Sequence, residues 1–314
     1  MAPLSIDELI DEGDGPSRRN GAVRLGEMPG GAPIDIPVTV IKGIESGPVV
    51  WIMAARDGDE VHASLAAMEI QRRILPEDVT GALVVIPIAN VPGFGVLSRE
   101  HPLAPTFLEQ QMDDAFFELL SAQGGFFVDL HSAGVPSDTV DWTLYVDRDD
   151  VAETMARAYG SPFAYVHRIG GGEGPDPGLL DGALFVRLSR AGLPSILVEA
   201  GGGLPPAQAT VERVVSGVIN VLRQLHAMSG PVEPPTNEQR VLRGFRIVTS
   251  SRGGLFTDGV RLGDEVRAGG LLARVIDPYG VVVEEIRAPV SGIILTVPVN
   301  PAAGTGTWAF EIGW

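Results

Sequence analysis

The amino-acid sequence predicts an α/β domain, in which helices cover both faces of a mostly parallel or mixed sheet, followed by a small all-β domain. Two observations lead to this prediction. Over residues 1–229, apolar runs typical of buried strands alternate with segments of helical periodicity. Over residues 240–314, short strand-like segments alternate with glycine turns, without a helical period. The chain has 314 residues, 45% of them apolar and 20% charged, which is enough to bury a large core.

The large domain begins with strand-like segments at residues 23–25 and 34–41. The apolar run VVWIMAA (49–55) predicts a strand buried on both faces, because it is bounded by SGP before and RDGDE after. Residues 60–75 carry apolar side chains at helical spacing, and ALVVIPIA (82–89) predicts another buried strand. This order predicts parallel strands joined by a crossover helix.

The same alternation continues to residue 228. Beyond it, the polar, proline-rich segment GPVEPPTNEQ (230–239) is typical of a linker. We therefore expect a large domain over 1–229, a linker over 230–239 and a β-barrel or sandwich over 240–314. Further helices are predicted over 108–122, 149–160, 181–192 and 207–228, and further strands over 124–131 and 194–202.

Composition excludes several classes of function. The formal charge of −17 and the pI near 4.6 would repel a phosphate backbone, so nucleic acid is not an expected partner. The chain contains no cysteine, which excludes thiolate catalysis, iron–sulfur clusters and cysteine-type zinc sites. The acidic N-terminus and the lack of an apolar run of membrane-spanning length predict a cytoplasmic protein without a membrane partner. Any metal must be held by His, Asp and Glu.

Polar side chains follow three of the predicted strands, at the sheet edge where open α/β sheets bind ligands. Asp57 and Glu60 are three residues apart, so a helical turn would place both carboxylates on one face. His131 can complete a three-ligand metal site with an open position, the arrangement of catalytic metals. Glu199 ends the strand SILVE and can transfer a proton beside that metal. Alternatively, Asp57 and Glu60 only stabilise a helix start.

Together these segments resemble the succinylglutamate desuccinylase and aspartoacylase family, of the zinc carboxypeptidase-like superfamily. The resemblance rests on IDIPVTVIKGIESGPVVWIMAARDGDE, ALVVIPIANVPGF, FFVDLHSAG and PSILVEAGGG, in the family's order. It implies a zinc-dependent amidohydrolase that removes an N-acyl group from a small amine or amino acid, with water activated by the metal and by Glu199. Candidate substrate-binding residues are Arg99, Asn90 and Arg168.

The sequence departs from this family at two places. The first ligand position, a histidine in the family, is Asp57, and HPLAPTFLEQQ (101–111) stands where the family has an Asn-Arg pair that stabilises the oxyanion. Two carboxylates and one imidazole lower the Lewis acidity of a divalent ion, so manganese and iron are alternatives to zinc. Arg56, Arg99 or Arg168 can replace the missing arginine. His62, two residues from Glu60, would point away and is expected to have a surface or packing role.

Other functions stay open at this point. A divergent member could have lost hydrolysis and act as a small-molecule binding protein, or could keep the metal as a lyase or acyl transferase. The hairpin APVSGIIL (288–295) resembles biotinyl- and lipoyl-carrier domains, but residues 240–314 contain no lysine to carry the cofactor. A role in shaping the mouth of the site or in subunit contacts is therefore expected. The sequence leaves assembly into a homo-oligomer open.

Overall fold

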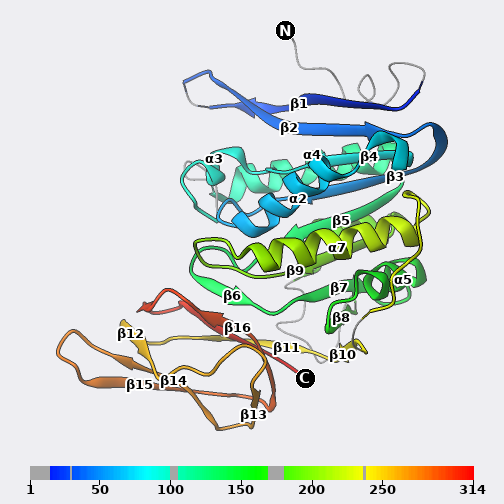
Figure 1. Ribbon diagram of the computed structural model, residues 1–314. Coiled ribbons are helices and arrows are strands. Elements are labelled where there is room, and N and C mark those ends of the chain that lie inside the picture. The colour runs from blue at the N-terminus through cyan, green and yellow to red at the C-terminus, as the bar shows by residue number, and fades with distance from the viewer. Residues whose placement is uncertain (1–14, 29, 100–104, 169–179, 236–237) are drawn as a thin grey trace.

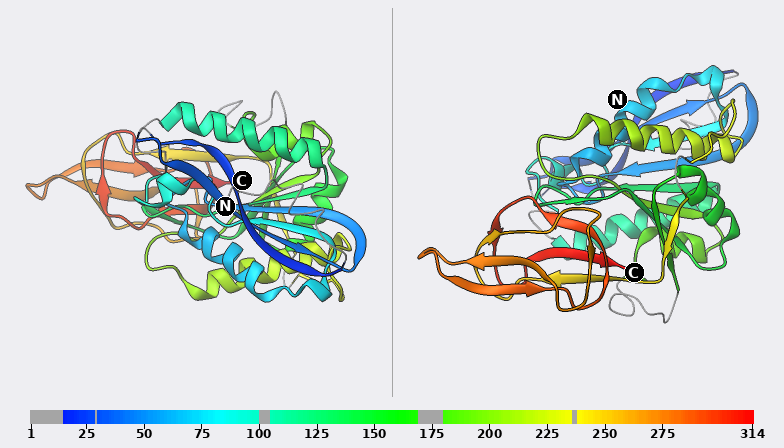
Figure 2. Two further views of the ribbon diagram at one scale, coloured as in Figure 1. Left: turned by 90° about the horizontal axis from the view of Figure 1, so that it is seen from above. Right: turned by 60° about the horizontal axis from the view of Figure 1, so that its bottom comes forward.

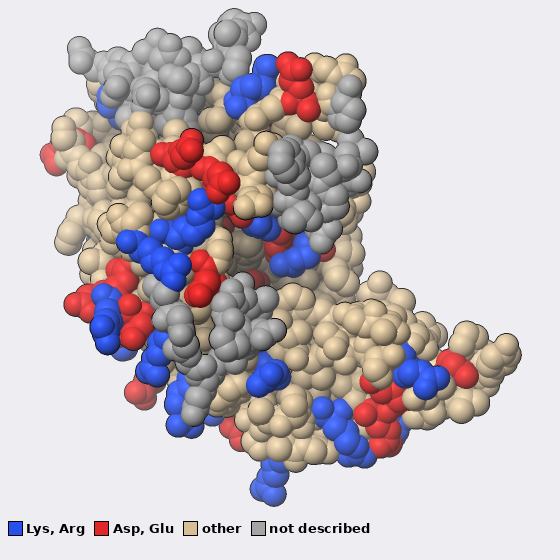
Figure 3. All heavy atoms as spheres, turned by 180° about the vertical axis from the view of Figure 1, so that it is seen from behind, with Lys and Arg blue, Asp and Glu red and all other residues tan. Residues whose placement is uncertain are grey.

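The computed structural model describes residues 15–28, 30–99, 105–168, 180–235 and 238–314, with the backbone alone for 105–109. A large α/β domain and a C-terminal β sandwich lie against each other (Figure 1). No helix in these ranges is long and apolar enough to cross a membrane. On the face seen in Figure 3, basic and acidic side chains lie interspersed, so the net charge is not gathered into one patch there.

The large domain is built on a nine-stranded mixed sheet in the order β1-β2-β4-β3-β5-β9-β7-β8-β10. The central strands β4, β3, β5 and β9 are parallel, whereas β1, β2 and β7 each pair antiparallel with a neighbour. This arrangement confirms the predicted fold class. The strands are β1 (Ser17–Glu27), β2 (Pro33–Lys42), β3 (Glu45–Ala54), β4 (Thr80–Ile86), β5 (Phe126–His131), β7 (Trp142–Val146), β8 (Phe163–His167), β9 (Ser195–Glu199) and β10 (Arg240–Leu242).

Helices cover both faces of this sheet, as the buried central strands require (Figures 1 and 2). One apolar core lies between the sheet and α2, α5 and α7, and a second lies between the sheet and α4 and α6. Every helix predicted from periodicity is present, with ends shifted by a few residues. The bounds are α2 (Val61–Arg73), η1 (Pro76–Asp78), α3 (Val91–Phe94), α4 (Pro105–Gln123), α5 (Asp150–Tyr159), α6 (Leu184–Arg190) and α7 (Gln208–Gln224).

The C-terminal domain is a sandwich of two antiparallel sheets with its own apolar core. One sheet has the order β11-β18-β16-β13 and is extended by β6, a short strand of the large domain that pairs with β16. The other has the order β15-β14-β12-β17. The strands are β6 (Ser137–Thr139), β11 (Phe245–Thr249), β12 (Gly254–Thr257), β13 (Glu265–Val266), β14 (Leu271–Ile276), β15 (Val282–Arg287), β16 (Gly292–Pro298), β17 (Ala302–Ala303) and β18 (Trp308–Gly313).

The two domains are joined more closely than a linker predicts. β10 lies in the predicted sandwich range but pairs in parallel with β8 of the large sheet. The second core of the large domain continues through Leu242 and Phe245 into Ile293 and Leu295 of the sandwich. The packing boundary therefore lies near residue 243, and the sandwich is fixed against the carboxyl edge of the sheet.

Candidate metal centre and active site

The candidate site lies where β3, β5 and β9 end. β3 ends at Ala54, and the chain then turns through Asp57 to Glu60, which precedes α2. His131 and Glu199 are the last residues of β5 and β9 and face each other as register partners. The sheet therefore brings these four predicted residues to one edge, although they are spread over more than a hundred positions in the sequence.

The loop that carries Asp57 is held by close backbone packing at Gly58. The Gly58 N–H donates a hydrogen bond to the Arg99 carbonyl at 3.1 Å, and a Cβ added to Gly58 would lie 2.3 Å from the Gly93 carbonyl carbon. Any side chain at this position would therefore displace the neighbouring loop. Asn90 caps α3 by accepting from the Gly93 N–H at 3.0 Å, and its amide donates to the Arg99 carbonyl at 3.5 Å. The DG pair and Asn90 thus fix the loop that presents Arg99.

Asp57, Glu60 and His131 form a buried cluster that can hold a metal ion. One ligand atom from each residue lies within 4.8 Å of the others. His131 Nδ1 lies 3.0 Å from Glu60 Oε2 and 3.8 Å from Asp57 Oδ2. Glu60 Oε1 is buried without a hydrogen-bond partner, and its ion-pair partner, Arg99 Nη1, lies 3.6 Å away, so a metal ion could bind this oxygen more closely. Two carboxylate oxygens and an imidazole nitrogen are a suitable donor set for a divalent transition metal.

Neighbouring groups orient the three candidate ligands. His131 Nε2 lies 3.3 Å from Asp129 Oδ1, so the carboxylate can fix the ring with Nδ1 toward the cluster, as in many metal-ligating histidines. The Ser132 N–H donates to Glu60 Oε2 at 3.2 Å. Arg56 donates from Nη1 to Asp57 Oδ1 at 2.9 Å, which leaves Asp57 Oδ2 toward the cluster. These contacts preorganise the ligands.

The electrostatics of the cluster depend on burial and on neighbouring charged groups. Burial opposes ionisation of Asp57, but Arg99, His131 and Arg56 outweigh it and lower the pKa of that carboxyl. Burial raises the pKa of Glu60 to about 7, and the charge of Asp57 adds to the effect. Arg99 Nη2 lies 2.6 Å from Asp57 Oδ2, and Arg99 Nη1 lies 3.6 Å from Glu60 Oε1. Arg99 therefore balances negative charge at the mouth of the cluster.

Glu199 lies beside the cluster, and its carboxyl group binds a proton more tightly than an exposed glutamate does. Burial raises the pKa of the Glu199 carboxyl well above its usual range, and the charge of Glu60 raises it further. Such a carboxyl can hold a proton near neutral pH and exchange it with a reacting group. A divalent ion at the cluster would favour the carboxylate form. A raised pKa of this kind is one that a general acid–base role requires.

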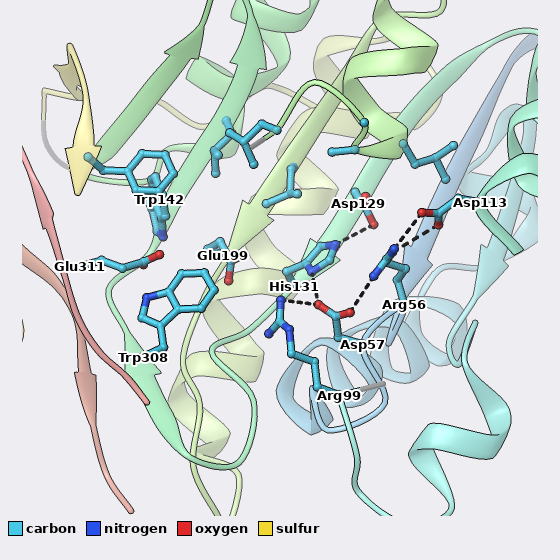
Figure 4. Close-up of a pocket in the computed structure, with 17 residues that line it drawn as sticks. Arg56, Asp57, Arg99, Asp113, Asp129, His131, Trp142, Glu199, Trp308 and Glu311 are labelled. Carbon is cyan, nitrogen blue, oxygen red and sulfur yellow. Dashed lines mark hydrogen bonds and ion pairs between the residues drawn. The ribbon is translucent and has the colours of Figure 1, made fainter. Parts of the chain in front are cut away.

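The site opens into a cavity of about 360 Å³ between the large domain and the sandwich (Figure 4). Asp57, Arg99, His131 and Glu199 line one part of it. The sandwich contributes to the opposite wall, as expected for a domain that shapes the mouth of the site. Further lining residues are Arg56, Asp113, Asp129, Trp142, Leu144, Leu180, Gly182, Ala183, Leu184, Leu197, Phe245, Trp308 and Glu311.

The structure places the other sequence candidates differently. Asn90 is buried behind Arg99 and does not line the cavity. Arg168 has a side chain that is 69% exposed, lies 3.9 Å from Asp147 and does not line the cavity. His62 accepts a hydrogen bond from the Ala207 N–H at 2.9 Å, in agreement with a packing role. Of the segment that replaces the Asn-Arg pair, residues 101–104 lie outside the described residues.

Sequence reasoning did not single out Asp113, Trp142, Trp308 or Glu311, which all line the cavity. Asp113 lies within a predicted helix, and Trp308 and Glu311 belong to the sandwich. No local motif marks any of them. These residues share only their position at the cavity in the folded chain. From the sequence, such spatial proximity can be predicted only for residues at strand ends.

Comparison with known proteins agrees with this geometry. No family model matches the chain. The N-alpha-acetyl-L-2,4-diaminobutyric acid deacetylase of Halomonas elongata is 29% identical over 285 residues, covering 82% of this chain and 80% of its own length. The succinylglutamate desuccinylase/aspartoacylase of Rhodobacter sphaeroides matches with a TM-score of 0.80 and 21% identity, over 96% of this chain and 97% of that one. In fold, this chain is similar to proteins of the succinylglutamate desuccinylase/aspartoacylase family.

A second solved structure is also similar over nearly the whole chain. The apo structure of the ectoine utilization protein EutE (DoeB) from Ruegeria pomeroyi has a TM-score of 0.76 and 25% identity, over 97% of this chain and 96% of that one. The aspartoacylase-like fold thus extends over both domains of the chain. The resemblance found in the sequence and the predicted fold are confirmed.

Proposed function

We propose that this protein is a metal-dependent amidohydrolase that removes an N-acyl group from a small amine or amino acid. One observation supports the proposal most directly: Glu199, a buried carboxyl of raised pKa, is the register partner of His131 in the three-residue cluster, and both residues line one cavity. Deacetylase and desuccinylase relatives that match most of the chain support the same reaction class.

Asp57, Glu60 and His131 are the residues that would hold the metal, with Asp129 orienting His131. A divalent ion bound there supplies Lewis acidity toward the amide carbonyl and toward water. Zinc is the first candidate. Because two of the three ligands are carboxylates, manganese and ferrous iron are the alternatives.

The chain's own groups account for the remaining steps. Glu199 accepts a proton from the attacking water and delivers it to the leaving nitrogen, so that the amine departs neutral. Arg99 has a half-exposed side chain at the mouth of the cluster and can donate to the developing oxyanion, in place of the family's missing arginine. Arg56 is less suited to this role, because its guanidinium is engaged by Asp57 and Asp113.

The proposal is tested by metal content and hydrolysis together. Protein purified without chelator should contain about one equivalent of a divalent transition metal, as expected for a single three-ligand site. Asp57→Ala and His131→Ala should lose it, whereas His226→Ala, a matched change at an exposed histidine, should retain it. Amine release is then measured on a panel of N-acetyl amino acids that includes N-α-acetyl-L-2,4-diaminobutyrate.

Two outcomes would contradict the proposal. If the parent protein contains no stoichiometric metal, both the proposed hydrolase activity and a metal-dependent lyase activity are excluded. A metal-loaded protein that binds N-acyl amino acids without hydrolysing any of them would favour the alternative of a small-molecule binding protein.

A further inference from the structure

The end of the cavity away from the metal ligands has an unusual composition. We call Trp142, Trp308 and Glu311 the aromatic–acidic subsite. Trp142 begins β7, and the other two residues lie on β18 of the sandwich. Figure 4 shows all three on the side of Glu199 that lies away from Asp57 and Arg56. No metal ligand belongs to this group, so its role differs from that of the cluster.

Glu311 is a buried carboxyl without a cation. Its residue is 8% exposed, and the Thr296 hydroxyl donates to Oε2 at 2.5 Å. No ion pair to Glu311 is found among the described residues. Burial raises the pKa of Glu311, although the Thr296 hydrogen bond and the charge of Arg99, which pairs with Asp57, act to lower it. A carboxyl in this position would be stabilised by a cationic group of a ligand.

No described cation belongs to the aromatic–acidic subsite. The two arginines that line the cavity, Arg56 and Arg99, pair with Asp57 and Asp113 at the end that holds the metal cluster. The segments outside the described residues contain neither lysine nor arginine in the sequence. A side-chain carboxylate of the substrate would therefore meet Glu311 rather than an arginine, and like charges in a desolvated site repel strongly.

Trp142 provides a second, independent sign of a ligand. The residue is 2% exposed, and its indole Nε1 is buried without a hydrogen-bond partner. Its ring is fixed edge-on by Phe245, with centroids 5.2 Å apart and planes at 76°. Figure 4 shows the indole nitrogen on the side that faces the Glu311 carboxylate. A rigid, unsatisfied donor in the cavity wall calls for an acceptor oxygen on the ligand.

The register of the sheet places this subsite within reach of the metal ligands. Trp142 pairs with Glu199, and Glu199 pairs with His131 on the next strand. Two strand spacings separate the backbones of Trp142 and His131, or roughly 10 Å. Side chains that point into the cavity from both ends shorten this span. One amino-acid-sized molecule can therefore place its amide at the cluster and its far end at Glu311.

We propose that the aromatic–acidic subsite selects N-acyl amino acids whose side chain ends in an ammonium group. The ammonium donates to Glu311 and lies against the ring of Trp308. This inference rests on the proposed function, because it places the scissile amide at the metal cluster. Such a preference would differ from that of proteins named for succinylglutamate, because the side chain of succinylglutamate ends in a carboxylate.

A matched trio of substrates tests the selection. N-α-acetyl-L-2,4-diaminobutyrate, N-acetyl-L-norvaline and N-acetyl-L-glutamate share two side-chain methylenes and end in an ammonium, a methyl and a carboxylate group. We expect kcat/KM for the ammonium substrate to exceed that for the methyl substrate by about 10- to 100-fold, the usual range for a charge-assisted hydrogen bond. The carboxylate substrate should be the poorest of the three. Calorimetric Kd values for the same compounds should follow the same order.

Amino-acid substitutions test whether the preference for the ammonium substrate arises at the aromatic–acidic subsite. Glu311→Gln should reduce the ammonium-to-methyl ratio by at least about tenfold, and Trp308→Leu by a smaller factor. Glu285→Gln, an exposed acid-to-amide change on the same domain, should leave the ratio unchanged. The ratio is independent of how much protein folds, so a destabilised variant still gives a valid result.

The outcomes separate this inference from the proposed function. Hydrolysis of all three substrates at equal rates would overturn the subsite and leave the hydrolase standing. Preferential binding of the ammonium compound without turnover would support the subsite and overturn the hydrolase. A ratio that Glu311→Gln does not change, or the absence of both binding and turnover, would overturn the subsite.

Discussion

Replacement of Arg56 by glutamine should destabilise the protein and weaken metal binding together. Arg56 donates to Asp113 from Nε at 3.2 Å and from Nη2 at 2.8 Å, and it donates to Asp57 from Nη1 at 2.9 Å. Asp113 is 7% exposed, so Arg56→Gln leaves a buried carboxylate without its partner. Breaking a buried ion pair in this way costs about 3–5 kcal/mol.

The expected value lies at the low end of that range, about 3 kcal/mol, because water reaches the guanidinium, whose side chain is 26% exposed. With a denaturant dependence of about 2–3 kcal/mol/M, the midpoint of urea unfolding should fall by about 1 M or more. Because Asp57 also loses its orienting donor, metal affinity should drop by about 10- to 100-fold. Urea titration followed by circular dichroism and metal competition with a chromophoric chelator measure the two effects.

A double-mutant cycle checks the reasoning. Arg56→Gln combined with Asp113→Asn removes the unpaired charge, so the double variant should be more stable than the sum of the single effects predicts, by about 1.5–3 kcal/mol. A fall in the midpoint below about 0.3 M for Arg56→Gln, or strictly additive single effects, would refute the claim that this pair is energetically coupled.

Three further changes test other parts of the structure. Glu199→Gln should lower turnover by about 10²–10⁴-fold while metal content measured by mass spectrometry stays unchanged, and loss of the metal would contradict a purely acid–base role. Gly81→Ala should lower stability by about 1–3 kcal/mol, because φ is +81° and the added Cβ would lie 2.1 Å from the Pro48 carbonyl oxygen; an unchanged melting temperature would refute this. The hydrogen bond from Arg73 lowers the pKa of Glu212 to about 2, so its stabilising effect is complete above the ordinary value of 4.5 and is lost as pH falls toward 2. Glu212→Gln should therefore lose less stability between those pH values than the parent, and parallel curves would contradict the assignment.

The sequence was sufficient for most of the large domain because its central strands are long apolar runs that end in polar residues. Asp57, Glu60, His131 and Glu199 could be predicted for that reason, since strand order alone brings strand ends together. β7 was not predicted, and it pairs antiparallel with β9, which the strand–helix alternation does not indicate. Its first residue, Trp142, is consequently absent from the predicted site.

The far wall of the cavity could not be predicted for a different reason. Glu311 and Trp308 are more than a hundred positions from the nearest metal ligand, and their pattern is that of an ordinary sandwich strand. What places them at the cavity is the packing of the sandwich on the sheet, which depends on non-local contacts such as β6 with β16. Local periodicity contains no information about such contacts.

The pairing of β6 with β16 has a consequence for how this protein can change over evolutionary time. The strand that extends the sandwich sheet leaves β5 only six residues after His131, so the two halves share backbone hydrogen bonds close to the reactive centre. The sandwich cannot be removed without exposing an unpaired strand edge. Point substitutions on β18, in contrast, leave that pairing intact. Substitutions in the sandwich can therefore change substrate preference, while the candidate catalytic residues of the large domain are retained.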